Sequence, residues 1–149
     1  LCEQYLSKAL GADQMITSDK TIDATDLNTI IQKGKVHMFG NWMFPLLKEY
    51  KIDVFWNSAS FGEMEPEIVK NYLNYIKNNT KYVYLLQARK GKESSKSAGV
   101  VNPITFSDYH TMLDSFKLIG ESDAYEANRR MSQSGGYFQA VWKKEELRD

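Results

Sequence analysis

Residues 53–64 read DVFWNSASFGEM, an apolar run that gives way to small polar residues. The run at 54–56 is typical of a strand that is buried on both faces of a parallel sheet. Asn57, Ser58 and Ser60 follow directly, at the point where the chain would leave such a strand. Open parallel sheets bind their ligands just beyond the carboxyl ends of the strands. The stretch therefore predicts a central strand followed by a ligand-binding loop.

The rest of the chain alternates strand patterns with helix patterns. Apolar runs predict strands at residues 14–17, 36–39, 52–56, 82–86, 117–121 and 137–143. Helical spacing and capping signals predict helices at residues 1–10, 26–32, 44–50, 66–77 and 108–116, the last with Ser107 as its N-cap. Residues 123–134 are polar and predict a loop. This alternation predicts an α/β fold with three layers.

Composition narrows the classes of function. The 149 residues are enough for one domain over 1–149, and 19 basic residues balance 19 acidic ones. This neutral balance disfavours nucleic-acid binding, which usually needs basic excess. No apolar run in the sequence reaches membrane-spanning length, so we expect no membrane partner. Cys2 is the only cysteine, which excludes an internal disulfide, and we expect a cytoplasmic protein without a metal site.

Residues 57–64 carry a resemblance to a known family. Their pattern N-S-x-S-F-x-E-M is similar to the motif that follows a strand in the sugar O-methyltransferases, which use S-adenosylmethionine. The flanking segments QYLSK at residues 4–8 and GYFQA at residues 136–140 resemble the family in their order. The resemblance covers most of the chain, but only the C-terminal portion of such a domain. It implies a Rossmann-like class I methyltransferase sheet, mostly parallel and closed by a C-terminal antiparallel hairpin.

The resemblance also implies a function, to which two alternatives stay open. It implies O-methyl transfer from S-adenosylmethionine to a sugar or sugar phosphate. The Gly-rich strand that holds this cofactor would lie upstream of Leu1, because none of the nine glycines forms a G-x-G-x-G pattern. We therefore expect part of a longer enzyme, inactive alone and possible as a homo-oligomer. The alternatives are a non-catalytic binding or assembly module and a dehydrogenase, although the nicotinamide fingerprint is missing from these residues.

Two positions after the strand at 36–39 are candidates for contact with the cofactor. In methyltransferases of this fold the corresponding loop often touches adenine. The resemblance thus implies that Asn41 binds the edge of the base and that Trp42 lies against its face. Asn57 and Ser58 complete the expected cofactor-binding residues. The alternative for Trp42 is a place in the core, where most large aromatic side chains lie.

Methyl transfer to a hydroxyl needs an aligned acceptor and, usually, a group that takes its proton. The resemblance implies Glu63 as that group, with His110 as a second candidate. The alternative for Glu63 is a carboxylate that stabilises the start of the next helix. Ser60, Gln87 and Arg89 are the expected substrate-binding residues. Arg89 opens a basic stretch that would attract an anionic substrate, or would simply be a solvated loop; its lysines are Lys90, Lys92 and Lys96.

Overall fold

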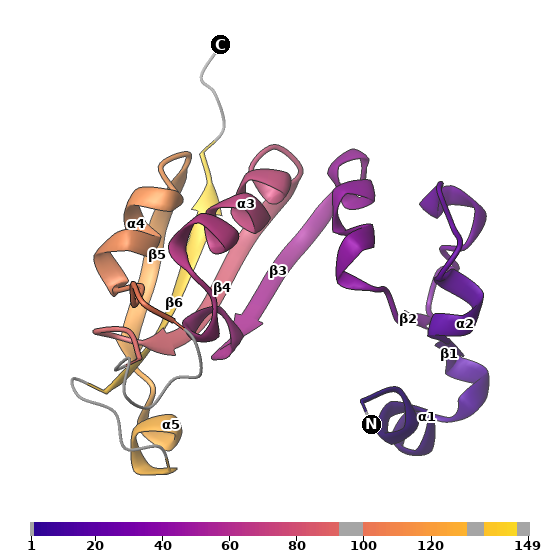
Figure 1. The fold of residues 1–149 in the computed structure, drawn as a ribbon, viewed down its shortest axis with the longest axis horizontal. Helices are drawn as coiled ribbons and strands as arrows, with labels where there is room; N and C mark the ends of the chain where they lie inside the picture. The colour runs from indigo at the N-terminus through magenta and orange to yellow at the C-terminus, as the bar shows by residue number, and fades with distance from the viewer. Residues whose placement is uncertain (1, 93–99, 131–135, 146–149) are drawn as a thin grey trace. The chain divides into compact units, whose positions relative to one another are not determined.

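The chain forms two compact units, Leu1–Glu49 and Tyr50–Asp149. They are seen in a computed structural model that describes residues 2–92, 100–130 and 136–145 (Figure 1). The expectation of a single domain over residues 1–149 stays a prediction. The first unit contains α1 (Cys2–Leu10), η1 (Ala12–Gln14), β1 (Met15–Ile16), α2 (Ser18–Thr21), η2 (Leu27–Thr29), β2 (Val36–His37) and η3 (Asn41–Glu49), where η marks a 3-10 helix.

A short parallel strand pair organises the first unit. Met15 of β1 pairs with Val36 of β2, at the places where the apolar runs predict strands. The helix predicted at residues 26–32 is wrong, because only the single turn η2 forms there. Asp26 caps the start of this turn, because its carboxylate accepts the N–H of Asn28 at 2.8 Å. The helix α2 was not predicted from the sequence.

The second unit is a mixed sheet with helices. Its elements are β3 (Ile52–Ser58), η4 (Ser60–Glu63), α3 (Pro66–Ile76), β4 (Thr80–Ala88), α4 (Phe106–Met112), β5 (Phe116–Asp123), α5 (Tyr125–Arg130) and β6 (Tyr137–Lys144). The strand order is β3-β4-β6-β5. β3 and β4 run parallel, whereas β6 is antiparallel to both of its neighbours. The predicted C-terminal antiparallel pairing is confirmed, but the sheet is mixed and not mostly parallel.

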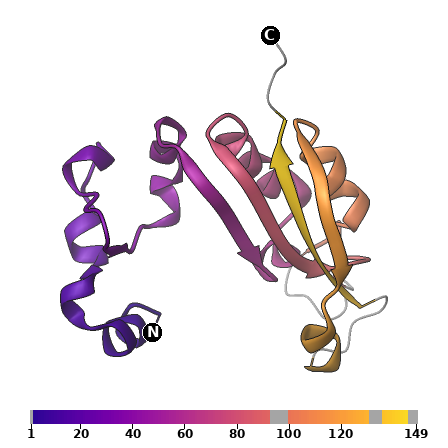
Figure 2. The ribbon, with the colours of Figure 1, turned by 180° about the vertical axis from the view of Figure 1, so that it is seen from behind.

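Helices cover one face of this sheet. Figures 1 and 2 show α3 and α4 on the same side of the strands. The covered face holds the core, in which Leu73, Val83 and Phe138 are fully buried. On the other face of β3, Val54 is 51% and Trp56 is 65% exposed. The expectation of a strand buried on both faces is therefore wrong, and the described part of this unit has two layers where three were expected.

The last two helices, α4 and α5, differ from the sequence predictions. α4 begins after Thr105, not after Ser107, because the Asp108 carboxylate accepts the Thr105 N–H at 2.8 Å and its hydroxyl at 2.7 Å. This pairing matches a capping box, in which the third helical residue reaches back to the cap. The chain then enters β5 at Phe116. The predicted loop at residues 123–134 is wrong where α5 forms, and residues 131–134 lie outside the described residues.

Candidate functional site

Three polar side chains meet where β3 and β4 end, and we call Asn57, Ser60 and Gln87 the strand-end cluster. The Asn57 carbonyl oxygen Oδ1 accepts a hydrogen bond from Gln87 Nε2 at 2.7 Å. The same oxygen accepts the backbone N–H of Phe61 at 3.3 Å. Asn57 Nδ2 donates to Ser60 Oγ at 2.7 Å. Parallel pairing of the two strands brings these residues together, as the sequence predicts for the carboxyl edge of a sheet.

A strained turn shapes this cluster. Ala59 has a φ of 65°, a left-handed conformation that a residue with a side chain rarely adopts. Its N–H still bonds to the Leu86 carbonyl at 2.8 Å, so the turn stays attached to β4. The next turn, η4, is held by the buried ring of Phe61, which packs against Phe55 and Tyr109 with centroids 6.0 and 6.5 Å away. Apolar packing thus maintains the strain that directs the Phe61 N–H toward Asn57.

Gln87 is the most buried member of the cluster. Its side chain is 1% exposed, and its Oε1 has no hydrogen-bond partner in the structure. Ser58 lies apart from the cluster, because side chains alternate between the faces of a strand and Ser58 follows Asn57 by one residue. Ser58 is exposed and shares its face of β3 with the exposed Trp56, two residues earlier. The cofactor-binding role expected for Ser58 stays a prediction, which its neighbour Asn57 is better placed to fill.

Two carboxylates beside the cluster contact the segment that follows β4. Glu63 forms an ion pair with Lys92, with Oε1 and Nζ 2.6 Å apart. Glu65 accepts hydrogen bonds from the backbone N–H groups of Val101 at 2.6 Å and Asn102 at 3.2 Å. The Val101 N–H, followed by the Asn102 side chain, lowers the pKa of Glu65. The two carboxylates therefore hold both flanks of residues 93–99, a stretch outside the described residues that includes Lys96.

Arg89 is committed to acidic partners. One of its guanidinium nitrogens, Nη2, lies 2.6 Å from the Glu121 carboxylate and 2.8 Å from the Asp123 carboxylate. Its guanidinium also lies over the rings of Phe106 and Phe138, 5.6 and 5.8 Å from their centroids. The hydrogen bond to Glu121 is the main cause that raises the pKa of Arg89. These contacts link β4 to β5 across the sheet, so binding of an anionic substrate by Arg89 stays a prediction.

His110 stands apart from these groups. It is exposed in the last turn of α4, and none of the hydrogen bonds that join the strand-end cluster involves it.

Within the described residues, no three His, Cys, Asp or Glu side chains gather as metal ligands. The same part of the chain contains no helix long and apolar enough to cross a membrane.

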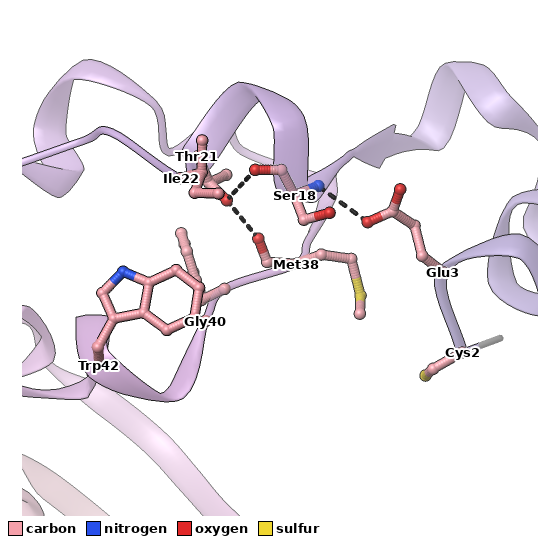
Figure 3. Close-up of a pocket in the computed structure, with 9 residues that line it drawn as sticks. Cys2, Glu3, Ser18, Thr21, Ile22, Met38, Gly40 and Trp42 are labelled. Atoms are coloured by element: carbon pink, nitrogen blue, oxygen red, sulfur yellow. Dashed lines mark hydrogen bonds between the residues drawn. The ribbon is translucent and has the colours of Figure 1, made fainter.

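The first unit has a pocket of its own, with a volume of about 280 Å³ (Figure 3). Trp42 is 63% exposed, and its indole lies over Gly40, where an added Cβ would overlap the ring. The hydroxyl of buried Thr21 donates to the Met38 carbonyl at 2.6 Å and fixes the floor of the pocket. Asn41 is exposed and does not line this pocket. The lining residues are Cys2, Glu3, Ser18, Thr21, Ile22, Met38, Phe39, Gly40 and Trp42.

Sequence reasoning missed several of these side chains. Glu65 carries a signal, since an acidic residue directly before a helix-starting proline is a plausible cap. Thr21 carries no local signal, and nothing local reveals that Lys92 of the basic stretch pairs with Glu63, because these partners lie 17 and 29 residues away in the sequence.

Comparisons with known proteins show similarity at the level of the fold. No protein-family model matches the chain, and no curated protein does. Among solved structures, magnesium protoporphyrin IX methyltransferase (ChlM) from Synechocystis PCC 6803 with bound SAH is similar, with a TM-score of 0.50 and 11% identity over 79% of this chain. TehB from Haemophilus influenzae has a TM-score of 0.44 and 10% identity, covering 96% of this chain and 67% of TehB.

The similarity to ChlM concerns only part of that protein. The chain spans 55% of the length of ChlM. At such low identity the likeness describes the fold and not the chemistry. The chain is a mixed α/β protein that resembles the methyltransferase fold in part.

Proposed function

We propose that this chain is the C-terminal part of an S-adenosylmethionine-dependent enzyme that methylates a sugar hydroxyl. The strand-end cluster carries the proposal, because it places amide and hydroxyl groups at the carboxyl ends of two parallel strands. Ligands of open α/β sheets bind at such edges. The partial likeness to a methyltransferase fold supports methyl transfer as the reaction.

The pocket of the first unit is the proposed site for the adenine of the cofactor. Its volume of about 280 Å³ suits a planar base better than the whole cofactor, since small-molecule sites usually start near 300 Å³. The Trp42 indole offers an exposed aromatic face, and Ile22 and Met38 supply apolar walls. Asn41 is proposed to bind the edge of the base from beside the pocket. S-adenosylmethionine, when bound, supplies an electrophilic methyl group.

The second unit is proposed to orient the acceptor. An aligned hydroxyl lowers the entropic part of the barrier, and fixed hydrogen-bonding groups provide the alignment. Ser60 Oγ accepts from Asn57 Nδ2, so its own O–H is free to donate to a sugar oxygen. Glu63 follows in η4 with an exposed carboxylate, and is proposed to take the proton of the hydroxyl.

Replacement of Glu63 tests the proposed base. In the enzyme that contains this chain, Glu63→Gln should lower kcat by roughly a hundredfold, the usual contribution of a positioned base. Binding of S-adenosylhomocysteine should stay unchanged. Glu67→Gln is the matched control, because Glu67 is an exposed carboxylate in the first turn of α3. Equal turnover for Glu63→Gln and the wild type would exclude this role.

A non-catalytic binding module is the second candidate function. One observation favours it: Glu63 and Arg89 both form ion pairs with residues of the same chain. A module of this kind would bind S-adenosylhomocysteine or a sugar without transfer of radiolabelled methyl groups. Detection of labelled sugar product would rule it out.

A further inference from the structure

The hydrogen bonds of the strand-end cluster fix which way its amide groups point. Asn57 Oδ1 receives the Phe61 backbone N–H, which can only donate, so this atom has to be the amide oxygen. The Gln87 atom 2.7 Å from that oxygen must then be a donor, which makes it Nε2. The other end of the Gln87 amide is therefore its oxygen. The orientation of both amides thus follows from the hydrogen-bond network.

This oxygen is buried without a donor. Gln87 is 1% exposed, and its Oε1 accepts no hydrogen bond in the structure. Gln87 faces Phe138 across the β4–β6 ladder, and the ring of Tyr109, whose own hydroxyl also has no partner, lies 6.0 Å from that of Phe138. The nearby Asn57 Nδ2 already donates to Ser60. Several buried side-chain atoms of the described residues lack a partner, but Gln87 Oε1 is the one that belongs to the strand-end cluster, where a bound molecule can supply the donor.

The charges at this edge of the sheet do not favour an anion. Arg89 is paired with Glu121 and Asp123, and Lys92 is paired with Glu63. An amide oxygen carries a partial negative charge and can only accept hydrogen bonds. A phosphate or carboxylate oxygen placed against Gln87 Oε1 would be repelled, whereas a hydroxyl would donate to it.

We propose that Gln87 sets the substrate specificity of this site: its Oε1 accepts a hydrogen bond from a neutral hydroxyl of the acceptor sugar and excludes an anionic group from the same position. This inference rests on the proposed function and makes it more specific. It selects an unmodified hydroxyl at the strand ends and corrects the emphasis on sugar phosphates that the basic stretch after β4 suggests.

Side-chain amide signals in ¹H–¹⁵N NMR spectra test this inference without any need for turnover. Titration of the enzyme with methyl α-D-glucopyranoside and methyl α-D-mannopyranoside should shift the Gln87 and Asn57 side-chain signals. Inorganic phosphate should leave them in place. Gln87→Met should weaken glycoside binding about tenfold, as expected for the loss of one hydrogen bond.

Gln139→Met is the matched control for this substitution. Gln139 is also a sheet glutamine, but its amide is bonded at both ends, to the Tyr84 hydroxyl at 3.1 Å and to Ser122 Oγ at 3.0 Å. It should bind the glycosides like the wild type. Phosphate-induced shifts at Gln87, absence of glycoside-induced shifts, or equal affinity of Gln87→Met and the wild type would each overturn the inference. So would a crystal structure in which a trapped water still occupies Gln87 Oε1 with glycoside bound.

The same samples separate this inference from the proposed function. Glycoside binding that depends on Gln87, without transfer of labelled methyl groups from S-adenosylmethionine, would defeat the methyltransferase assignment and support the hydrogen bond. Methyl transfer with an unchanged KM for the sugar in Gln87→Met would defeat the hydrogen bond alone.

Discussion

Glu65 illustrates what a single residue does in this chain. Its carboxylate receives the backbone N–H groups of Val101 and Asn102 and also the Asn102 side chain. Hydrogen bonds of this kind favour the ionised form, and they lower the pKa of Glu65 below its ordinary range. Glu65 thereby attaches the start of α3 to the segment after residue 99.

The pH dependence of this attachment has a definite sign. A carboxyl with a lowered pKa in the folded chain contributes its full stability above its unfolded pKa of about 4.3, and loses it as the pH falls through the folded pKa. The backbone N–H signals of Val101 and Asn102 should therefore shift in NMR spectra recorded below about pH 4.3. In Glu65→Gln this titration should disappear. Identical shifts in the variant would show that another group controls this segment.

The sequence predicts the positions of some candidate residues, but it does not predict the partners of others. Asn57, Ser60 and Gln87 follow apolar runs, so the sequence predicts them at the ends of neighbouring strands, and the structure brings them together. The partners of Glu63 and Arg89 lie 29 to 34 residues away, where no local pattern reveals them.

At the scale of elements, the start of α4 depends on spacing more than on residue type. Thr105 and Ser107 are both good N-cap residues, and Ser107 is the one that the sequence pattern favoured. Only Thr105 has an acidic residue three positions later, and Asp108 indeed bonds to it. The capping box therefore decides where the helix begins.

Substitution in the cap tests this boundary. Asp108→Ala should lower the free energy of unfolding by about 1 kcal/mol, the usual contribution of a helix cap. Ser107→Ala should change it by less than about 0.5 kcal/mol, as most surface substitutions do. Urea denaturation followed by circular dichroism measures both values. A larger loss for Ser107→Ala would restore the boundary that the sequence suggested.

Arg89 links the end of β4 to β5, so its replacement should lower the free energy of unfolding. Arg89→Met takes away the ion pairs and leaves the carboxylates of Glu121 and Asp123 near one another without a cation. We expect a loss of about 1 kcal/mol, since the side chain is partly exposed and solvent weakens such pairs. Arg89→Lys should not restore it fully, because an ammonium group lacks the planar surface with which the guanidinium lies over the Phe106 and Phe138 rings.

Urea denaturation at low and high salt checks this expectation. The difference in the free energy of unfolding between the wild type and Arg89→Met should become smaller at high salt, because salt screens the ion pairs. A variant as stable as the wild type, with weaker binding of a sugar phosphate, would instead support the anion-binding role.

At the scale of the whole molecule, apolar runs predict where the strands lie, but they do not predict which faces of the strands are covered by helices. Six strands lie where runs of apolar residues predicted them. Whether both faces of a strand are covered depends on helices far away in the sequence. α3 and α4 pack on the same face, and Val54 and Trp56 therefore remain exposed despite their apolar character. α5 escaped prediction because polar residues dominate its sequence.

Calorimetric titration of S-adenosylhomocysteine into the enzyme that contains this chain tests the methyltransferase assignment most directly. We expect saturable binding that Trp42→Ala weakens at least about tenfold, since the indole is proposed to stack on adenine. Trp56→Ala should bind like the wild type, because Trp56 is equally exposed, at 65% against 63%, but lies on the second unit. Absence of binding, or equal affinity of Trp42→Ala and the wild type, would contradict the account.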